Sequence, residues 1–287
     1  MPTSSTGKLH FKSKLILIEG IPGSGKTTTA QFIADWLGEN DHHPALYLEG
    51  DWNHPADFES VATLSDHDFK QIKSRFPDQA GVLTQHNQRV NGQWFINYGQ
   101  MKHIHPDLVP SELHQALSQF DIYQLPAEQH IHLLQARWQQ FARQAATENN
   151  VYVFESCFLQ NPFTTLLARH NLDLQSIQQH IFALAEIINE LNPKLVYLYQ
   201  NDVPATLEDI RRKRPQGWAD FVTWYLTGQE YGRVHGLAGY DGIIEFYARR
   251  QALELELLNV LPLSSLVLSD ADEWDKRYND IKAFLRA

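Results

Sequence analysis

Short runs of consecutive hydrophobic residues alternate along the chain with stretches whose hydrophobic positions recur every three or four residues. The runs occupy positions 15–18, 45–48, 151–154, 195–199 and 266–268. Continuous runs of this length are typical of strands that are buried on both faces of a parallel sheet. The spacing of an amphipathic helix is followed after the first run by Ala30, Ile33, Ala34 and Leu37. The alternation therefore predicts an α/β fold with a five-stranded, mainly parallel sheet and helices on both faces.

Two stretches interrupt this alternation, at about 52–125 and 215–240. The first contains an Asn91-Gly92 pair between strand-like flanks, which is a strong signal for a hairpin. The second is rich in glycine and aromatic residues. We interpret both as inserted loop or hairpin regions near the active face, because loops on a rigid scaffold usually carry specificity. Residues 15–287 are predicted to form a single domain, preceded by a flexible tail at 1–14.

The segment Gly20-Ile21-Pro22-Gly23-Ser24-Gly25-Lys26-Thr27 carries the strongest functional signal. It matches the pattern G-x-x-x-x-G-K-[ST] and lies between a predicted strand and a predicted helix, which is the context that a phosphate-binding loop requires. Its glycines let the backbone turn its N–H groups inward, and the next helix begins there, so the segment forms an anion site. We assign nucleotide binding to Gly20, Gly23, Ser24, Gly25, Lys26, Thr27 and Thr28. Lys26 can reach the β- and γ-phosphates, and the Thr27 hydroxyl can ligate Mg²⁺.

Composition and charge narrow the function classes. The formal net charge of −10 disfavours broad nucleic-acid binding, which needs a basic field. No hydrophobic run approaches 18 residues, so no membrane-spanning helix is expected. Cys157 is the only cysteine, which excludes an intrachain disulfide and fits a reducing cytoplasm. A homodimer is compatible with the sequence.

Several segments resemble the thymidylate kinase and deoxynucleoside kinase branch of P-loop kinases. Ile18-Glu19-Gly20 and the loop are similar to the first strand of those enzymes, and the segment 198–204 is similar to their fourth strand. Phe154-Glu155-Ser156 is similar to their Glu-Arg-Ser, and Arg211 to Arg214 lie where that family carries an arginine-bearing lid. The resemblance implies a three-layer P-loop NTPase fold, ATP or GTP as phosphate donor, and Mg²⁺. The chain departs from the family because position 156 lacks the arginine, so neither thymidine nor its monophosphate is implied.

Acidic residues at predicted strand ends are candidates for the chemistry. The second strand is followed by Glu49-Gly50-Asp51, which resembles the second strand of adenylylsulfate, shikimate and chloramphenicol kinases, where a carboxylate faces the acceptor hydroxyl. Asp51 is our first choice for that role and Glu49 the second, although an Asp in this position also often caps a turn. Glu155 ends the central strand and is expected to hold metal-bound water opposite Thr27.

Arginines after the fourth strand are candidates for the closing lid. Arg211 and Arg214 share one face of a predicted helix, from which they could neutralise charge on the transferring phosphoryl group. The alternative is a solvated basic end that complements the helix dipole.

These features together predict an ATP-dependent phosphotransferase that acts on a small nucleoside- or nucleotide-like acceptor. An antibiotic phosphotransferase and a regulatory nucleotide-binding protein remain open alternatives. A nucleic-acid end kinase is disfavoured by the negative charge.

Overall fold

The computed structural model describes residues 12–287, apart from the side chain of Gln216. Most of the predicted tail, residues 1–11, lies outside the described part. Ser13 is buried, and the Lys14 side chain donates to the carbonyls of Ala146 and Glu148 at 2.7 and 2.8 Å, so these two residues already belong to the fold. The chain divides into two compact units, of which the first combines residues 1–49 with 138–287 and the second spans 50–137.

A parallel five-stranded sheet forms the centre of the first unit. Its strand order is β2-β6-β1-β7-β8. The strands are β1 (Leu15–Gly20), β2 (Pro44–Tyr47), β6 (Val151–Glu155), β7 (Lys194–Tyr199) and β8 (Ser264–Ser269). Because β1 pairs with both β6 and β7 in parallel, the carboxyl ends of all three lie at one edge of the sheet. The predicted α/β fold class is confirmed.

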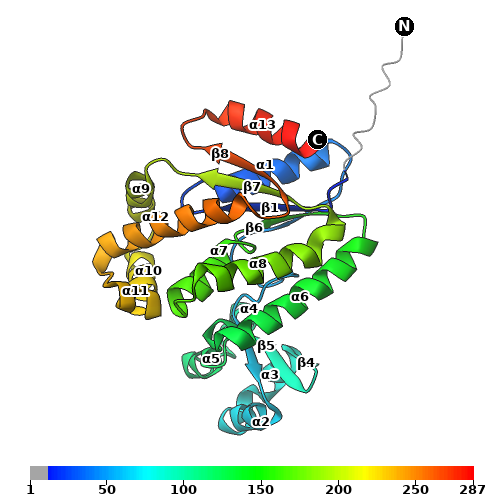
Figure 1. The fold of residues 1–287 in the computed structure, drawn as a ribbon. Helices are drawn as coiled ribbons and strands as arrows, with labels where there is room; N and C mark the ends of the chain where they lie inside the picture. The colour runs from blue at the N-terminus through cyan, green and yellow to red at the C-terminus, as the bar shows by residue number, and fades with distance from the viewer. Residues whose placement is uncertain (1–11) are drawn as a thin grey trace. The chain divides into compact units, whose positions relative to one another are not determined.

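Helices cover both faces of this sheet, as the strand pattern requires (Figure 1). One face packs against α1 (Lys26–Glu39) and α13 (Trp274–Arg286), and its core contains Ile16 and Ile18 of β1. The other face is covered by α8 (Leu174–Ile188), α12 (Gly239–Leu258) and the second half of α6 (Ala127–Thr147). There the rings of Trp138 and Phe154 meet edge to face with their centroids 6.1 Å apart. The result is a three-layer arrangement.

Shorter helices connect these layers. The segment after β6 forms a helical turn, α7 (Gln160–Pro162), and a π-helix at Phe163–Arg169, and a 3₁₀ turn at Asn189–Leu191 follows α8. After β7 come α9 (Val203–Lys213), α10 (Gln216–Gly228) and α11 (Glu230–His235). The segment 215–240, expected as a loop or hairpin insertion, is therefore helical. Gly236 ends α11 with a φ of +70°, whereas Gly232 lies within α11 and packs against the backbone of Thr227.

The second unit is a small sheet with helices of its own. Its antiparallel strands follow the order β3-β5-β4. They are β3 (Val61–Leu64), β4 (Asn87–Val90) and β5 (Gln93–Asn97). The helices of this unit are α2 (Asp66–Arg75), α3 (Ala80–Gln85), α4 (Tyr98–Ile104) and α5 (Ser111–Ser118), with 3₁₀ turns at Pro77–Gln79 and Ile122–Gln124. Asn91 and Gly92 join β4 to β5 with φ angles of +49° and +82°, which confirms the predicted hairpin.

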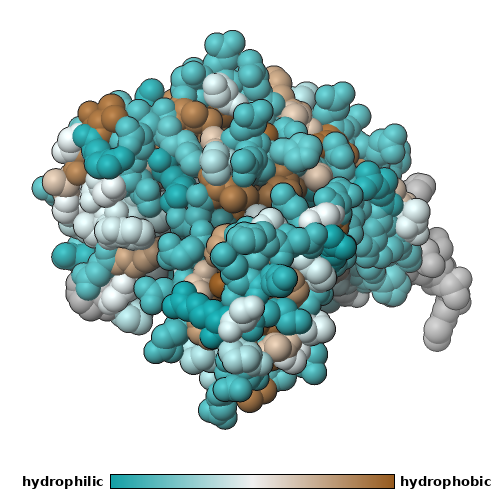
Figure 2. Space-filling view, turned by 90° about the horizontal axis from the view of Figure 1, so that it is seen from below, coloured by the Kyte–Doolittle hydropathy of each residue, from teal (hydrophilic) through white to brown (hydrophobic). Residues whose placement is uncertain are grey.

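The surface is mainly hydrophilic on the face that Figure 2 shows, with apolar residues in small groups among polar ones. This agrees with the burial of the large apolar side chains in the sheet core. Among the described helices, none combines the length and the apolar character that crossing a membrane would require.

Candidate functional site

The loop from Gly20 to Thr27 leaves β1 and enters α1 at the carboxyl edge of the sheet. Gly23 and Gly25 have φ angles of +85° and +93°, a region that residues with a Cβ rarely adopt. Gly25 directly precedes α1 and has no capping side chain, so no N-cap side chain pairs with the first N–H groups of this 14-residue helix. The segment therefore has the shape of an anion site built from backbone N–H groups and a helix N-terminus.

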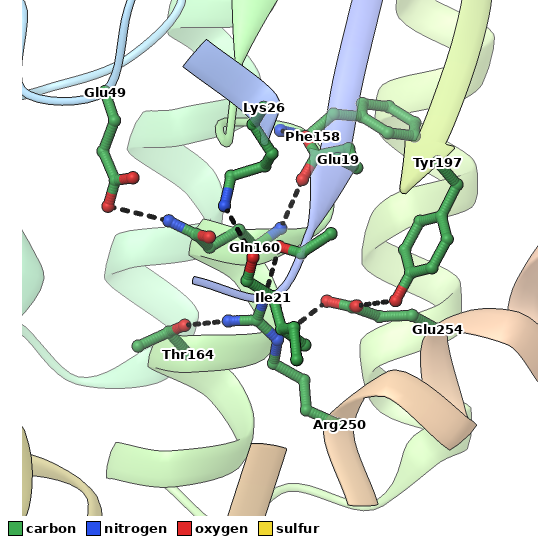
Figure 3. Close-up of polar contacts among 11 residues, drawn as sticks. Glu19, Ile21, Lys26, Glu49, Phe158, Gln160, Thr164, Tyr197, Arg250 and Glu254 are labelled. Atoms are coloured by element: carbon green, nitrogen blue, oxygen red, sulfur yellow. Dashed lines mark hydrogen bonds and ion pairs between the residues drawn. The ribbon is translucent and has the colours of Figure 1, made fainter. Parts of the chain in front are cut away.

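Lys26 lies inside this loop. Its residue is 5% exposed, and its ammonium Nζ donates to the carbonyl of Ile21 at 3.1 Å (Figure 3). Burial lowers the pKa of Lys26, while the nearby Glu49 and Glu155 carboxylates partly oppose this effect. The ammonium is thus held where a phosphate could replace the carbonyl as its partner.

Thr27 and Glu155 form a pair at the start of α1 and the end of β6. The Thr27 hydroxyl donates to Glu155 Oε1 at 2.8 Å, and the Glu155 residue is 4% exposed. Within residues 12–287 no group of three or more His, Cys, Asp or Glu side chains could hold a metal by itself. One hydroxyl and one carboxylate nevertheless fit Mg²⁺, which takes few protein ligands and completes its octahedron with water and phosphate oxygens. The structure therefore brings together the two residues that the sequence assigned to the metal.

Glu49 joins this pair from the end of β2. Its backbone N–H donates to Glu155 Oε2 at 3.3 Å, and its own carboxylate accepts from Gln160 Nε2 at 2.8 Å. The Ser156 hydroxyl donates to Glu49 Oε2 at 3.4 Å. Because β2 and β6 are parallel neighbours, the two glutamates leave the sheet at the same edge. Ser156 has a φ of +67°, a strained conformation for a residue with a side chain, at the position where deoxynucleoside kinases carry an arginine.

A buried polar network that the sequence analysis missed supports the loop from beneath. Glu19, the residue before the loop, is fully buried and accepts backbone N–H groups from Phe158 at 2.7 Å and Gln160 at 3.0 Å. Burial raises the pKa of Glu19 to about 7, against the lowering effect of these hydrogen bonds. Glu19 thereby ties the start of the loop to the turn after β6.

Arg250 on α12 also holds the start of the loop, through the carbonyl of Gly20. Its guanidinium donates to the carbonyl of Gly20 at 2.8 Å and to the Thr164 hydroxyl at 3.3 Å, and it forms an ion pair with Glu254 at 3.0 Å (Figure 3). Glu254 in turn accepts from the Tyr197 hydroxyl at 2.6 Å. The Arg250 and Glu254 side chains are 1% and 0% exposed. In the sequence an Arg and a Glu four residues apart on a helix read as a surface pair, so nothing there signalled this contact.

Two elements pack closely on the glycines of the loop. A Cβ at Gly23 would come within 2.6 Å of Ile210 on α9, and a Cβ at Gly25 would come within 2.6 Å of the Trp274 ring. The Trp274 ring also lies 4.1 Å from the Arg277 guanidinium, measured to the ring centroid. The loop is thus bordered by α9 on one side and by the start of α13 on the other.

The candidate lid arginines lie at the end of α9. Arg211 pairs with Glu208 at 3.0 Å and stacks on Tyr240 at 4.5 Å, and Arg214 lies 5.9 Å from the centroid of the Trp218 ring. Both residues are exposed. The helix ends at Lys213, and Arg214 and Pro215 have extended backbone, which places a break next to the basic cluster.

Asp51, the first choice for the acceptor-facing acid, belongs to the second unit. Its carboxylate accepts the backbone N–H of Asn53 at 2.8 Å, so it forms the turn cap that was the alternative. The acid that the structure places beside Glu155 and near Lys26 is Glu49.

Comparisons with known proteins add little to this picture. No protein-family model matches the chain, and no curated protein matches it. Among solved structures the chain is similar to a thymidine kinase, EHV4-TK, complexed with TP4A. The similarity covers 95% of this chain and 90% of that chain, at 12% identity and a TM-score of 0.35. We therefore base the function on the geometry of the site alone.

Proposed function

We propose that the protein is an ATP-dependent phosphotransferase that moves the γ-phosphoryl group of ATP, or of GTP, to a small acceptor. One observation carries the proposal. The loop 20–27 joins a buried strand to a helix N-terminus through left-handed glycines, and it encloses a lysine beside a threonine–glutamate pair. This combination is suited to a nucleoside triphosphate.

Each group at the loop has a role in this proposal. The backbone N–H groups of Gly23, Ser24 and Gly25 and the Lys26 ammonium bind the phosphates. Thr27 and Glu155 would hold Mg²⁺, which supplies positive charge against the phosphate oxygens. Gly20 at the start of the loop and Thr28 just after it would complete the nucleotide-binding set. Because phosphoryl transfer requires positioning and electrostatic stabilisation more than covalent chemistry, these groups suffice for the donor half of the site.

Glu49 is the acid that we place at the acceptor. The acceptor oxygen forms a bond to the γ-phosphorus, and the bond from that phosphorus to the β,γ-bridging oxygen breaks, so ADP leaves with the electron pair. If the acceptor is a hydroxyl, its proton passes to the Glu49 carboxylate. Asp51 is the competing candidate, and substitution separates the two.

The basic end of α9 would close over the phosphates. Arg211 and Arg214 lie next to the break at Pro215, and triphosphate charge would draw them away from Glu208 and Trp218. Closure also keeps water from the γ-phosphorus, so that the acceptor and not water is phosphorylated.

The test is a screen that measures ATP consumption and product formation with nucleosides, nucleoside monophosphates, sugars and antibiotics as acceptors. Wild-type protein, Glu49→Gln and Asp51→Asn are compared with the best acceptor. We expect Glu49→Gln to lower the rate of transfer by about 10² to 10⁴ at nearly unchanged ATP affinity, the usual range for a positioned proton acceptor. We expect Asp51→Asn to have the smaller effect, and the reverse order would move the role to Asp51.

The same screen separates the alternatives. A protein that binds ATP and transfers to none of the acceptors would be a regulatory nucleotide-binding protein. Transfer to antibiotics alone would indicate an antibiotic phosphotransferase.

A further inference from the structure

Gln160 brings an unused hydrogen-bond acceptor to the site. The residue is 6% exposed, and its Oε1 atom has no hydrogen-bond partner anywhere in residues 12–287. Its Nε2 atom donates to Glu49 Oε1 at 2.8 Å. An unpaired buried amide oxygen costs stability, so its presence beside a candidate catalytic acid calls for a partner supplied by a ligand.

The Glu49 carboxylate fixes the orientation of this amide. If the amide were turned over, Oε1 would face the carboxylate and two acceptors would oppose each other. The observed orientation therefore leaves Oε1 as the free atom. Figure 3 shows the amide between Glu49 and the Lys26 ammonium, at the end of the loop.

Apart from the Lys26 ammonium, the polar groups near Gln160 are acceptors or are already hydrogen-bonded. Glu49 and Glu155 present carboxylate oxygens, and the Ser156 hydroxyl donates to Glu49. The Arg250 guanidinium is held by Gly20, Thr164 and Glu254. Lys26 belongs to the triphosphate loop. The acceptor side of the site therefore offers negative charge and hydrogen-bond acceptors.

Building on the proposed phosphotransfer, we infer that the phosphoryl acceptor is an uncharged or cationic alcohol, rich in hydroxyl or N–H donors, and not a phosphate monoester. One hydroxyl faces Glu49 and is phosphorylated, with ADP as the leaving group and the proton taken by Glu49. A second donor group of the same molecule binds Gln160 Oε1. A monoester dianion would instead meet the Glu49 carboxylate and the Gln160 amide oxygen, which repel it.

The test uses pairs of compounds that differ by one phosphate. Nucleosides, hexoses and amino sugars are each compared with their own monophosphate in thermal-shift titrations, in the presence of Mg²⁺ and a non-hydrolysable ATP analogue. We expect at least one unphosphorylated compound to bind and its monophosphate to bind at least 10-fold more weakly, by the repulsion of like charges. Gln160→Met is expected to lower the affinity for the alcohol by roughly 3- to 10-fold, which corresponds to one neutral hydrogen bond. The affinity for the ATP analogue should be unchanged.

Gln144 offers a matched control, because its Nε2 also donates to a glutamate Oε1 at 2.8 Å but on the exposed face of α6. Gln144→Met should leave alcohol binding unchanged. The inference is overturned if monophosphates bind as tightly as their alcohols, if no alcohol of the panel binds, or if Gln160→Met has no more effect than Gln144→Met. An alcohol that binds through Gln160 but is not phosphorylated by ATP would overturn the proposed function and leave the ligand class standing.

Discussion

Replacing Arg250 by methionine tests how the structure supports the nucleotide loop. The substitution keeps an unbranched side chain on α12 but removes the guanidinium from Glu254, Thr164 and the carbonyl of Gly20. It leaves Glu254, which is 0% exposed, without its cation, while the Tyr197 hydroxyl still donates to it.

The expected cost follows from burial. Removing one partner of a buried ion pair costs about 3–5 kcal/mol of unfolding free energy, because the remaining charge is left in a poorly solvated place. Arg233 offers a matched control, since it pairs with Glu230 on α11 with 67% and 46% of the two side chains exposed. Arg233→Met should cost no more than about 1 kcal/mol. Adding Glu254→Gln to Arg250→Met removes the orphaned charge and should recover part of the loss.

Urea unfolding of the three variants and the wild type gives these free energies directly. Burial already raises the pKa of Glu254 and Arg250 opposes it, so removing Arg250 should raise it further. Protonation then relieves the orphaned charge, and the penalty of Arg250→Met should be smaller at pH 5 than at pH 8. A penalty no larger than that of Arg233→Met, or one that grows at low pH, would refute the reasoning.

Three further predictions rest on other residues of the first unit. Burial raises the pKa of Glu19 from 4.5 to about 7, so between these pH values the folded protein holds a proton that the unfolded chain has released. The free energy of unfolding should therefore fall by up to about 3 kcal/mol as the pH rises from 4.5 through 7. Unfolding measured from about pH 4 to 8 should show this slope in the wild type and not in Glu19→Gln. Gly25→Ala should weaken ATP binding and cost at least about 1–2 kcal/mol of unfolding free energy, because its φ is +93° and its Cβ would meet Trp274. Calorimetry of Gly38→Ala, near the end of α1 with open space around the residue, should show neither loss. Hydrogen exchange at 205–220 should slow when Mg²⁺ and an ATP analogue bind, and equal protection in both states would make this segment a rigid helix and remove the lid.

Local signals in the sequence predicted the parts of the structure that local physics determines. The hydrophobic runs located the five strands. The reason holds for β1, β6 and β7, which are buried on both faces and need a continuous apolar stretch, whereas the edge strands β2 and β8 are partly exposed. The Asn91-Gly92 pair located the hairpin, because two consecutive left-handed residues are needed there. The loop 20–27 could also be predicted, because its turns need glycines with positive φ angles at Gly23 and Gly25.

The prediction of a loop or hairpin insertion at 215–240 is wrong, because the glycines of this segment lie in or beside helices. Gly217 and Gly228 lie in the first and last turns of α10, and Gly236 ends α11, so they mark the boundaries of helices. Glycine at a helix end costs little stability, so a glycine-rich sequence fits both a loop and a series of short helices. Only the packing of the segment decides between the two.

The support beneath the loop could not be predicted from local patterns. Arg250 lies 230 positions after Gly20, and only the folded chain brings them together. Gln160 lies in a short irregular helix after β6 with no periodicity to mark it. Glu49 and Asp51 are only two residues apart, so the sequence does not determine which of them lies at the edge of the sheet beside Glu155.

The most direct measurement of the central claim is a calorimetric titration of Mg·ATP into wild-type protein, Lys26→Ala and the exposed-lysine control Lys70→Ala. We expect one binding site in the wild type and in Lys70→Ala, and a loss of affinity of at least about 100-fold in Lys26→Ala, equivalent to about 2.7 kcal/mol. Lys26→Ala should stay folded without ligand, with a melting temperature lowered by the loss of the buried ammonium near Glu49 and Glu155. Equal ATP affinity in Lys26→Ala and wild type would contradict the assignment of the loop 20–27 as the nucleotide site.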